Sequence, residues 1–192
     1  MPQPPSNEMS AVDSGDAYEV VAEACGAVEL CPAAPVATCP ATPEAEAAIK
    51  VGKKGDPSLR WRARGFAAPA GAFDDPAIDY QLCVYTDDGV APALATDPAA
   101  PRGVHWKRKD GHASYRAEKG AEGIRRLDLA EQGGLGELSA EVSSDELPTL
   151  PLGASTALVL QLMDSNGGCV GSSFDTPKKN DADRYQAEIP AD

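Results

Sequence analysis

Two imidazoles are available for general-base catalysis, because His105 and His112 are the only histidines in the chain. An acyl-transfer enzyme needs a nucleophile, a base and an orienting acid in contact with one another. His112 follows Gly111 in a segment typical of a turn, and His105 precedes Trp106 at the start of an expected strand. Neither lies in a nucleophile motif such as G-x-S-x-G. We therefore interpret both as surface residues and expect no catalytic residue.

Acidic side chains form three clusters with the composition of a glycosidase pair or a calcium site, at residues 74–75, 87–88 and 164–167. All three coincide with expected turns, where Asp and Asn are favoured because their side chains hydrogen-bond the backbone. Asp164 and Asn166 resemble the start of a calcium loop, but no Glu follows at the spacing that would close it. They are weak calcium candidates, and we expect no other metal and no cofactor.

Three arginines, Arg60, Arg62 and Arg64, alternate with apolar residues between positions 58 and 65. Because successive side chains of a strand point to opposite faces, the pattern predicts a half-buried strand with three cations on one face. Lys107 and Lys109 repeat the spacing. Such a face fits an anionic polysaccharide or the chain's own acidic N-terminal segment. It also fits a solvated strand face whose charges discourage pairing with other chains.

The five cysteines show no C-x-x-C spacing and lie far in sequence from both histidines, which argues against zinc. Cys83 and Cys169 each lie in an apolar segment. They either pair across the core, which favours an oxidising compartment, or remain buried free thiols. The other three, Cys25, Cys31 and Cys39, are odd in number, so one is left over or pairs with sequence further upstream.

Charge is strongly negative and uneven along the 192 residues. The 17 basic and 30 acidic side chains give a net charge of −13, which argues against nucleic acid as a partner. Residues 1–49 contain eight acidic side chains, seven of the 17 prolines and no Lys or Arg. Such a segment cannot bury enough apolar surface to offset the entropy of ordering it. We expect residues 1–48 to form a mostly disordered tail and residues 49–192 to form one domain.

Two targeting features are missing from the sequence. The first residues lack the charged region and apolar core of a signal peptide, so we expect either a leader that has been removed, a sequence that is a fragment, or a cytosolic protein. No apolar run reaches the roughly 18–20 residues that span a bilayer, so we expect no membrane span.

Within the tail, helical spacing of apolar residues predicts one short helix over residues 17–30.

After residue 49 the chain consists of short apolar or alternating runs broken by Gly, Pro and Asp, which is typical of an all-β domain. No helix separates the runs, so the strands must be mainly antiparallel. Their number favours a β-sandwich, with a closed barrel as the alternative. The Pro-rich link at residues 147–152 predicts a crossover between two sheets. The expected strands cover residues 58–65, 79–86, 90–94, 105–109, 113–119, 123–130, 137–142, 156–163, 169–174 and 185–189.

Four segments occur in a familiar order and spacing: DPSLRW at 56–61, DYQLCVY at 79–85, LQLMDSNGGC at 160–169 and PKKND at 177–181. Over residues 49–188 the chain resembles an uncharacterised module of predicted secreted proteins from environmental bacteria. Members of that module carry a Trp where this chain has Val170. The resemblance implies secretion and a Cys83–Cys169 disulfide, and it implies no activity.

These observations lead to one expected function and one alternative. We expect a non-catalytic, extracytoplasmic β-sandwich that binds a carbohydrate or protein partner or serves a structural role. The alternative is a small secreted hydrolase that uses turn carboxylates. Two carboxyl groups about 5–9.5 Å apart in a pocket would favour the hydrolase.

Overall fold

The computed structural model describes residues 30–68, 71–75, 77–86, 94–95, 105–118, 122–153 and 157–191. These residues form twelve strands and contain no helix, so none of them belongs to a helix that could cross a membrane. The strands are β1 (Glu44–Val51), β2 (Pro57–Ala67), β3 (Tyr80–Tyr85), β4 (Leu94–Ala95), β5 (Trp106–Lys109), β6 (His112–Arg116), β7 (Gly123–Gln132), β8 (Leu135–Ser143), β9 (Leu158–Asp164), β10 (Cys169–Phe174), β11 (Lys179–Asn180) and β12 (Arg184–Ile189).

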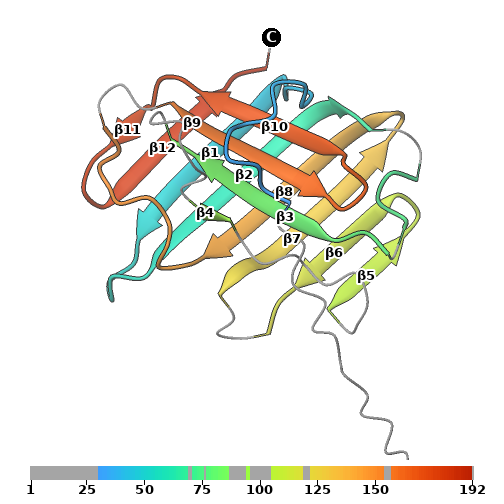
Figure 1. Ribbon diagram of the computed structural model, residues 1–192, viewed down its shortest axis with the longest axis horizontal. Coiled ribbons are helices and arrows are strands. Elements are labelled where there is room, and N and C mark those ends of the chain that lie inside the picture. The colour runs from blue at the N-terminus through green and yellow to red at the C-terminus, as the bar shows by residue number, and fades with distance from the viewer. Residues whose placement is uncertain are drawn as a thin grey trace, which may run out of the picture.

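The strands form two sheets that pack face to face, which confirms the predicted β-sandwich over the barrel (Figure 1). The larger sheet has eight strands in the order β11-β12-β1-β2-β8-β7-β6-β5, and the smaller has four in the order β10-β9-β3-β4. Every neighbouring pair of these strands is antiparallel. The Pro-rich link at residues 147–152 leads from β8 in the larger sheet to β9 in the smaller, which confirms the predicted crossover.

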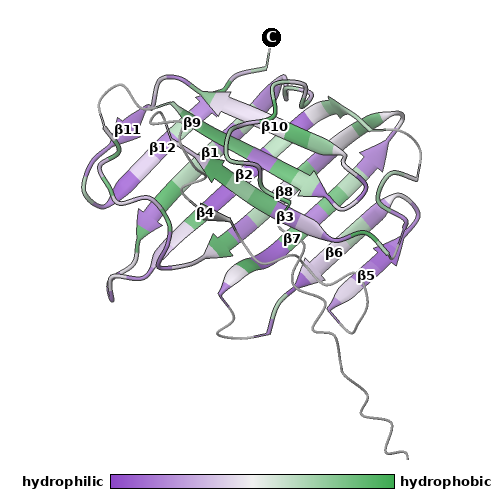
Figure 2. Cartoon of the chain, in the orientation of Figure 1, coloured by the Kyte–Doolittle hydropathy of each residue, from purple (hydrophilic) through white to green (hydrophobic). Residues whose placement is uncertain are grey.

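Hydrophobic and hydrophilic residues alternate along the long strands of the larger sheet (Figure 2). In β2, Leu59, Trp61 and Ala63 are at most 1% exposed, whereas the arginines between them are exposed. The strand β3 is buried at all six positions, as expected for a strand covered on both faces. The apolar core between the sheets therefore follows from local period-two patterns.

The chain enters the sandwich earlier than the predicted boundary between residues 48 and 49, which falls inside β1. Residues 44–47 alternate Glu and Ala, and both alanines, Ala45 and Ala47, are buried while the glutamates point outward. The high density of like charge in this segment masks the alternation. The predicted helix lies outside the described residues except for Leu30.

The predicted Cys83–Cys169 disulfide is wrong, because the structure pairs Cys31 with Cys83 and Cys39 with Cys169. Strand β9 lies between β3 and β10, so Cys83 and Cys169 are two strands apart on one face. Strands separated by about 9–10 Å are too far apart for a disulfide. Both cysteines point away from the core, where residues 30–39 cover the smaller sheet.

This N-terminal strap, residues 30–42, is also held by hydrogen bonds. The amide side chain of Gln161 accepts from Val36 N at 2.9 Å and donates to Val36 O at 2.9 Å. At the edge of the smaller sheet, Thr42 N donates to Gly171 O at 3.0 Å. The strap is therefore a built part of the sandwich, although its composition predicts a tail.

Candidate binding face

The outer side of the larger sheet, which faces away from the smaller sheet, collects most of the positive charge of the chain. We call it the basic face. The charged side chains that line three adjoining hollows on this face number ten basic and seven acidic, whereas the whole chain carries −13. The basic ones are Lys50, Arg60, Arg62, Arg64, Lys107, Lys109, Arg116, Arg125, Arg126 and Arg184, and the acidic ones are Glu44, Glu46, Glu118, Asp128, Glu137, Glu141 and Glu188. Arg108 also borders the second hollow but is not counted, because its guanidinium lies over the Trp106 ring and donates to Phe73 O.

The three arginines singled out in the sequence lie together on this face, and each has a carboxylate partner on a neighbouring strand. Arg60 contacts Glu141 at 2.7 Å, Arg62 contacts Glu46 at 3.0 Å, and Arg64 lies 3.8 Å from Glu44. The arginine side chains are 49–58% exposed. Exposed pairs of this kind contribute about 0–1 kcal/mol, so an incoming anion can compete for the guanidinium groups.

A second group of arginines lies on β6 and β7 and has fewer acidic partners. Arg116 and Arg126 are directly opposite each other in the β6–β7 register. Arg126 bonds Asp128, but among the described residues no carboxylate lies within ion-pair distance of Arg116 or Arg125. Like charges directly opposite each other destabilise a sheet. Among the described residues, Arg116 and Arg125 therefore form a local excess of positive charge without an ion-pair partner.

An irregularity in β7 brings Arg125 onto the same face. The β7–β8 register shifts between Ile124 and Arg126, which is the sign of a β-bulge. Arg125 lies at the shift, and its carbonyl accepts a hydrogen bond from Ala117 N at 2.9 Å. Two successive arginines consequently line the same hollow. Their adjacency between Ile124 and Leu127 breaks strict alternation, and this break is the sequence signal that could have placed Arg125 here.

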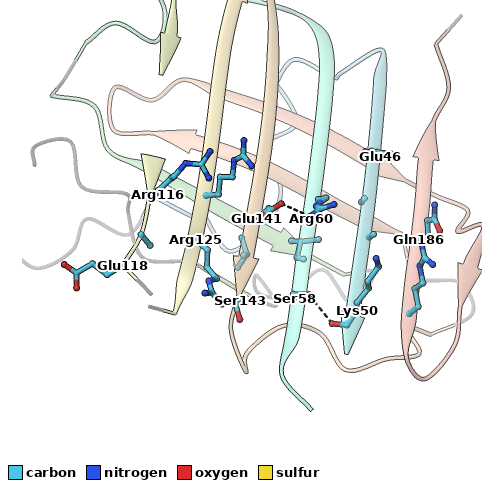
Figure 3. Close-up of a pocket in the computed structure, with 17 residues that line it drawn as sticks. Glu46, Lys50, Ser58, Arg60, Arg116, Glu118, Arg125, Glu141, Ser143 and Gln186 are labelled. Atoms are coloured by element: carbon cyan, nitrogen blue, oxygen red, sulfur yellow. Dashed lines mark hydrogen bonds and ion pairs between the residues drawn. The ribbon is translucent and has the colours of Figure 1, made fainter. Parts of the chain in front are cut away.

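The first hollow is an open groove of about 610 Å³ that runs across β6, β7, β8, β2, β1 and β12. Five inter-strand steps of about 4.8 Å make it about 24 Å long. Figure 3 shows Arg116 and Arg125 toward one end, Lys50 toward the other, and the Arg60–Glu141 pair between them. A second hollow of about 710 Å³ adjoins it and shares Arg116, Arg126 and Glu141. Cations therefore recur along a continuous shallow surface.

No Phe, Trp or Tyr side chain lines these hollows in the described part of the chain. The aromatic residues pack elsewhere, as in the ring contacts of Trp106 with Tyr80 at 5.6 Å and with Tyr115 at 5.3 Å. Neutral sugars are commonly held by stacking on exposed aromatic rings. The basic face offers charge and hydrogen-bond donors instead.

The other predicted candidates lie apart from the basic face or at its rim. Asp164 Oδ1 accepts hydrogen bonds from Asn166 N at 2.8 Å and Gly168 N at 3.0 Å, which shapes the β9–β10 turn. His112 lines the second hollow, and His105 Nε2 lies 4.0 Å from Glu118. Within the described residues no three His, Cys, Asp or Glu side chains form a group that could hold a metal.

Two of the acidic clusters considered for hydrolysis lie in described turns. Asp74 Oδ1 accepts from Gly111 N at 3.2 Å, and Asp75 Oδ1 accepts from Ala77 N at 2.8 Å. Like Asp164, these carboxylates bond backbone groups of turns. The cluster at 87–88 lies outside the described residues.

Searches of protein-family models, curated proteins and solved structures found no match to this chain.

Proposed function

We propose that this protein is a non-catalytic, extracytoplasmic binding module whose basic face holds an acidic polysaccharide. The carrying observation is the excess of cations on this one face of an otherwise acidic molecule. Arg116, Arg125 and Lys50 have no carboxylate partner among the described residues, so their charges are available to a ligand.

The net charge of −13 does not prevent such binding. At physiological ionic strength the Debye length is about 8 Å, so charges on the far side of the sandwich are screened. A polyanion in contact with the groove experiences mainly the local excess of cations. Negative charge more than a Debye length from the groove reduces the association rate more than the strength of the final contacts.

The shape and lining of the groove favour a linear polysaccharide over a protein partner. Protein interfaces depend on apolar and aromatic anchors buried in a central patch. Among the described residues that line the groove there is no Phe, Trp or Tyr, and the largest apolar residues, Leu59 and Val142, are each 1% exposed. The groove's length of about 24 Å suits a polymer lying across the strands.

The proposed compartment is supported by the two disulfides. Disulfides persist in oxidising environments and are rare in the reducing cytosol. Secretion, which the resemblance to a secreted module implies, remains part of this proposal.

The test is a binding titration of the intact, oxidised chain with heparin, polygalacturonate and neutral dextran at several salt concentrations. We expect both acidic polymers to bind at low salt, dextran not to bind, and affinity to fall steeply as salt rises. The double variant Arg116→Glu, Arg125→Glu should bind at least about tenfold more weakly, because two lost contacts of about 1 kcal/mol become repulsive.

The matched control is Lys53→Glu, Lys54→Glu, which makes the same charge change in the β1–β2 turn away from the hollows. It should alter affinity less than about twofold if position rather than net charge matters. Equal losses in the two double variants, or no binding to either acidic polymer, would overturn the proposal. Release of new reducing ends from a polymer would show an enzyme instead.

A further inference from the structure

In one cross-strand row of the basic face, positive and negative side chains alternate except at Arg126 and Arg116, which are neighbours of the same charge. In the register of β2, β8, β7 and β6, the row reads Arg60, Glu141, Arg126, Arg116. A carboxylate separates the first two arginines, whereas the last two face each other directly, with Cβ atoms about 5 Å apart. One negative charge bound between Arg126 and Arg116 would restore the alternation of positive and negative charge along this row.

We infer that this pair is a subsite for a tetrahedral oxyanion ester, so that the ligand is a sulfated polysaccharide; this rests on the proposed function. The two guanidinium groups present two planar sets of N–H donors to neighbouring space. A sulfate ester has three terminal oxygens and can accept hydrogen bonds from both forks at once. A carboxylate has two oxygens, which a single arginine fork satisfies.

The surroundings of the pair fit this assignment. Arg116 and Arg126 line both of the larger hollows, so an ester group bound there lies at the junction of the two. The bulge brings Arg125 to the same groove, where a neighbouring part of the polymer would pass. Among the described residues, the one ion-pair partner of these two arginines is Asp128, which contacts Nε of Arg126. The terminal nitrogens of the Arg126 guanidinium remain available to the ligand.

The fold itself gives no reason to keep two arginines opposite each other. Facing like charges weaken strand pairing, so Arg116→Gln should leave the thermal midpoint of the free protein unchanged or higher. The same change should weaken binding of a sulfated polymer. A residue with a merely structural role would show the opposite result, with lower stability and unchanged binding.

The deciding experiment compares heparin with heparin whose sulfate groups have been removed and whose carboxylates remain. The wild-type chain should bind heparin at least about tenfold more tightly than the desulfated polymer at equal salt. Arg116→Lys keeps the charge but removes the fork, and should remove most of this preference. The control Lys53→Arg, which keeps the charge in the β1–β2 turn away from the hollows, should leave this preference unchanged.

Two further arms separate the sources of a tetrahedral oxyanion. Inorganic sulfate alone should shift the side-chain NMR signals of Arg116 and Arg126 in the wild type. In Arg116→Lys it should not shift the Arg126 signals. Binding of phosphorylated dextran, a polymer of phosphate esters, as tight as that of heparin and with the same dependence on Arg116 would show that a phosphate ester is the ligand and overturn the assignment to sulfate. Equal binding of heparin and desulfated heparin would overturn the subsite but leave the proposed function intact. Failure of both polymers to bind would overturn the proposed function itself.

Discussion

Replacing Ser172 with alanine tests whether one buried hydroxyl links the two sheets and the strap. Ser172 lies on β10 of the smaller sheet and is 2% exposed. Its Oγ accepts a hydrogen bond from Trp61 Nε1, on β2 of the larger sheet, at 3.1 Å. Thr42 Oγ1, at the end of the strap, lies 2.6 Å from the same atom. Three segments that are distant in sequence therefore meet at one oxygen.

The expected cost follows from the groups left without a partner. Trp61 is 0% and Thr42 is 3% exposed, so water does not readily replace the lost hydroxyl. A buried polar group left unpaired costs about 1–3 kcal/mol. The indole N–H bears this cost in full, whereas the Thr42 hydroxyl can rotate. We expect Ser172→Ala to lower the free energy of unfolding by about 2–4 kcal/mol.

The assay is urea unfolding of the oxidised protein, followed by tryptophan fluorescence. The control is Ser173→Ala on the same strand, where the hydroxyl is exposed and bonds Asp175 at 3.2 Å, and where a loss below about 0.5 kcal/mol is expected. In a Trp61→Phe background the cost of Ser172→Ala should shrink by about 1–3 kcal/mol, because no indole N–H remains to be left unpaired. Equal effects of the two serine variants would refute the link.

Three further outcomes are expected from the structure. Gly136→Ala should destabilise the fold by about 1–3 kcal/mol in urea unfolding, because a Cβ there would lie 2.2 Å from the Phe66 ring; a change within about 0.5 kcal/mol would contradict this. Burial raises the pKa of Tyr185 from its ordinary 10.0 to about 12. The stabilisation that comes from this shift is therefore complete below pH about 10 and is lost as the pH rises toward 12. In Tyr185→Phe this part of the loss of stability at high pH should disappear, and an unchanged dependence of stability on pH would contradict the prediction. Replacing Cys39 and Cys169 with serine opens a loop with a sequence separation of 130, which should lower stability by up to about 5 kcal/mol, and an unchanged urea midpoint would be the contrary result.

Local patterns in the sequence predict the strands well. The alternation at 58–65 and the apolar run at 79–86 correspond to β2 and β3, because the direction of a side chain from a strand depends on its immediate neighbours. The crossover at 147–152 is also local, since proline there interrupts strand pairing. The segment at 44–51 is harder to predict, because its charge and proline content point to a tail while its alternation points to a strand.

Pairing of cysteines depends on tertiary structure. Cys83 lies between Leu82 and Val84, both of which point into the core, so it must point away from the core. The sequence alone could not show that a Pro-rich strap covers that outer face and carries the two partner cysteines. Disulfide partners are set by which segments pack together over long sequence separations.

The basic face likewise combines features that the sequence predicts with features that depend on the tertiary structure. That Arg60, Arg62 and Arg64 share one face of a strand can be read from their spacing, because period two is a property of the extended backbone. Their neutralisation by glutamates on β1 and β8, and the meeting of Arg116 with Arg126 without an intervening carboxylate, cannot be read from any spacing in the chain. Strand order and register decide which side chains become neighbours, and both are set by the packing of the whole sandwich.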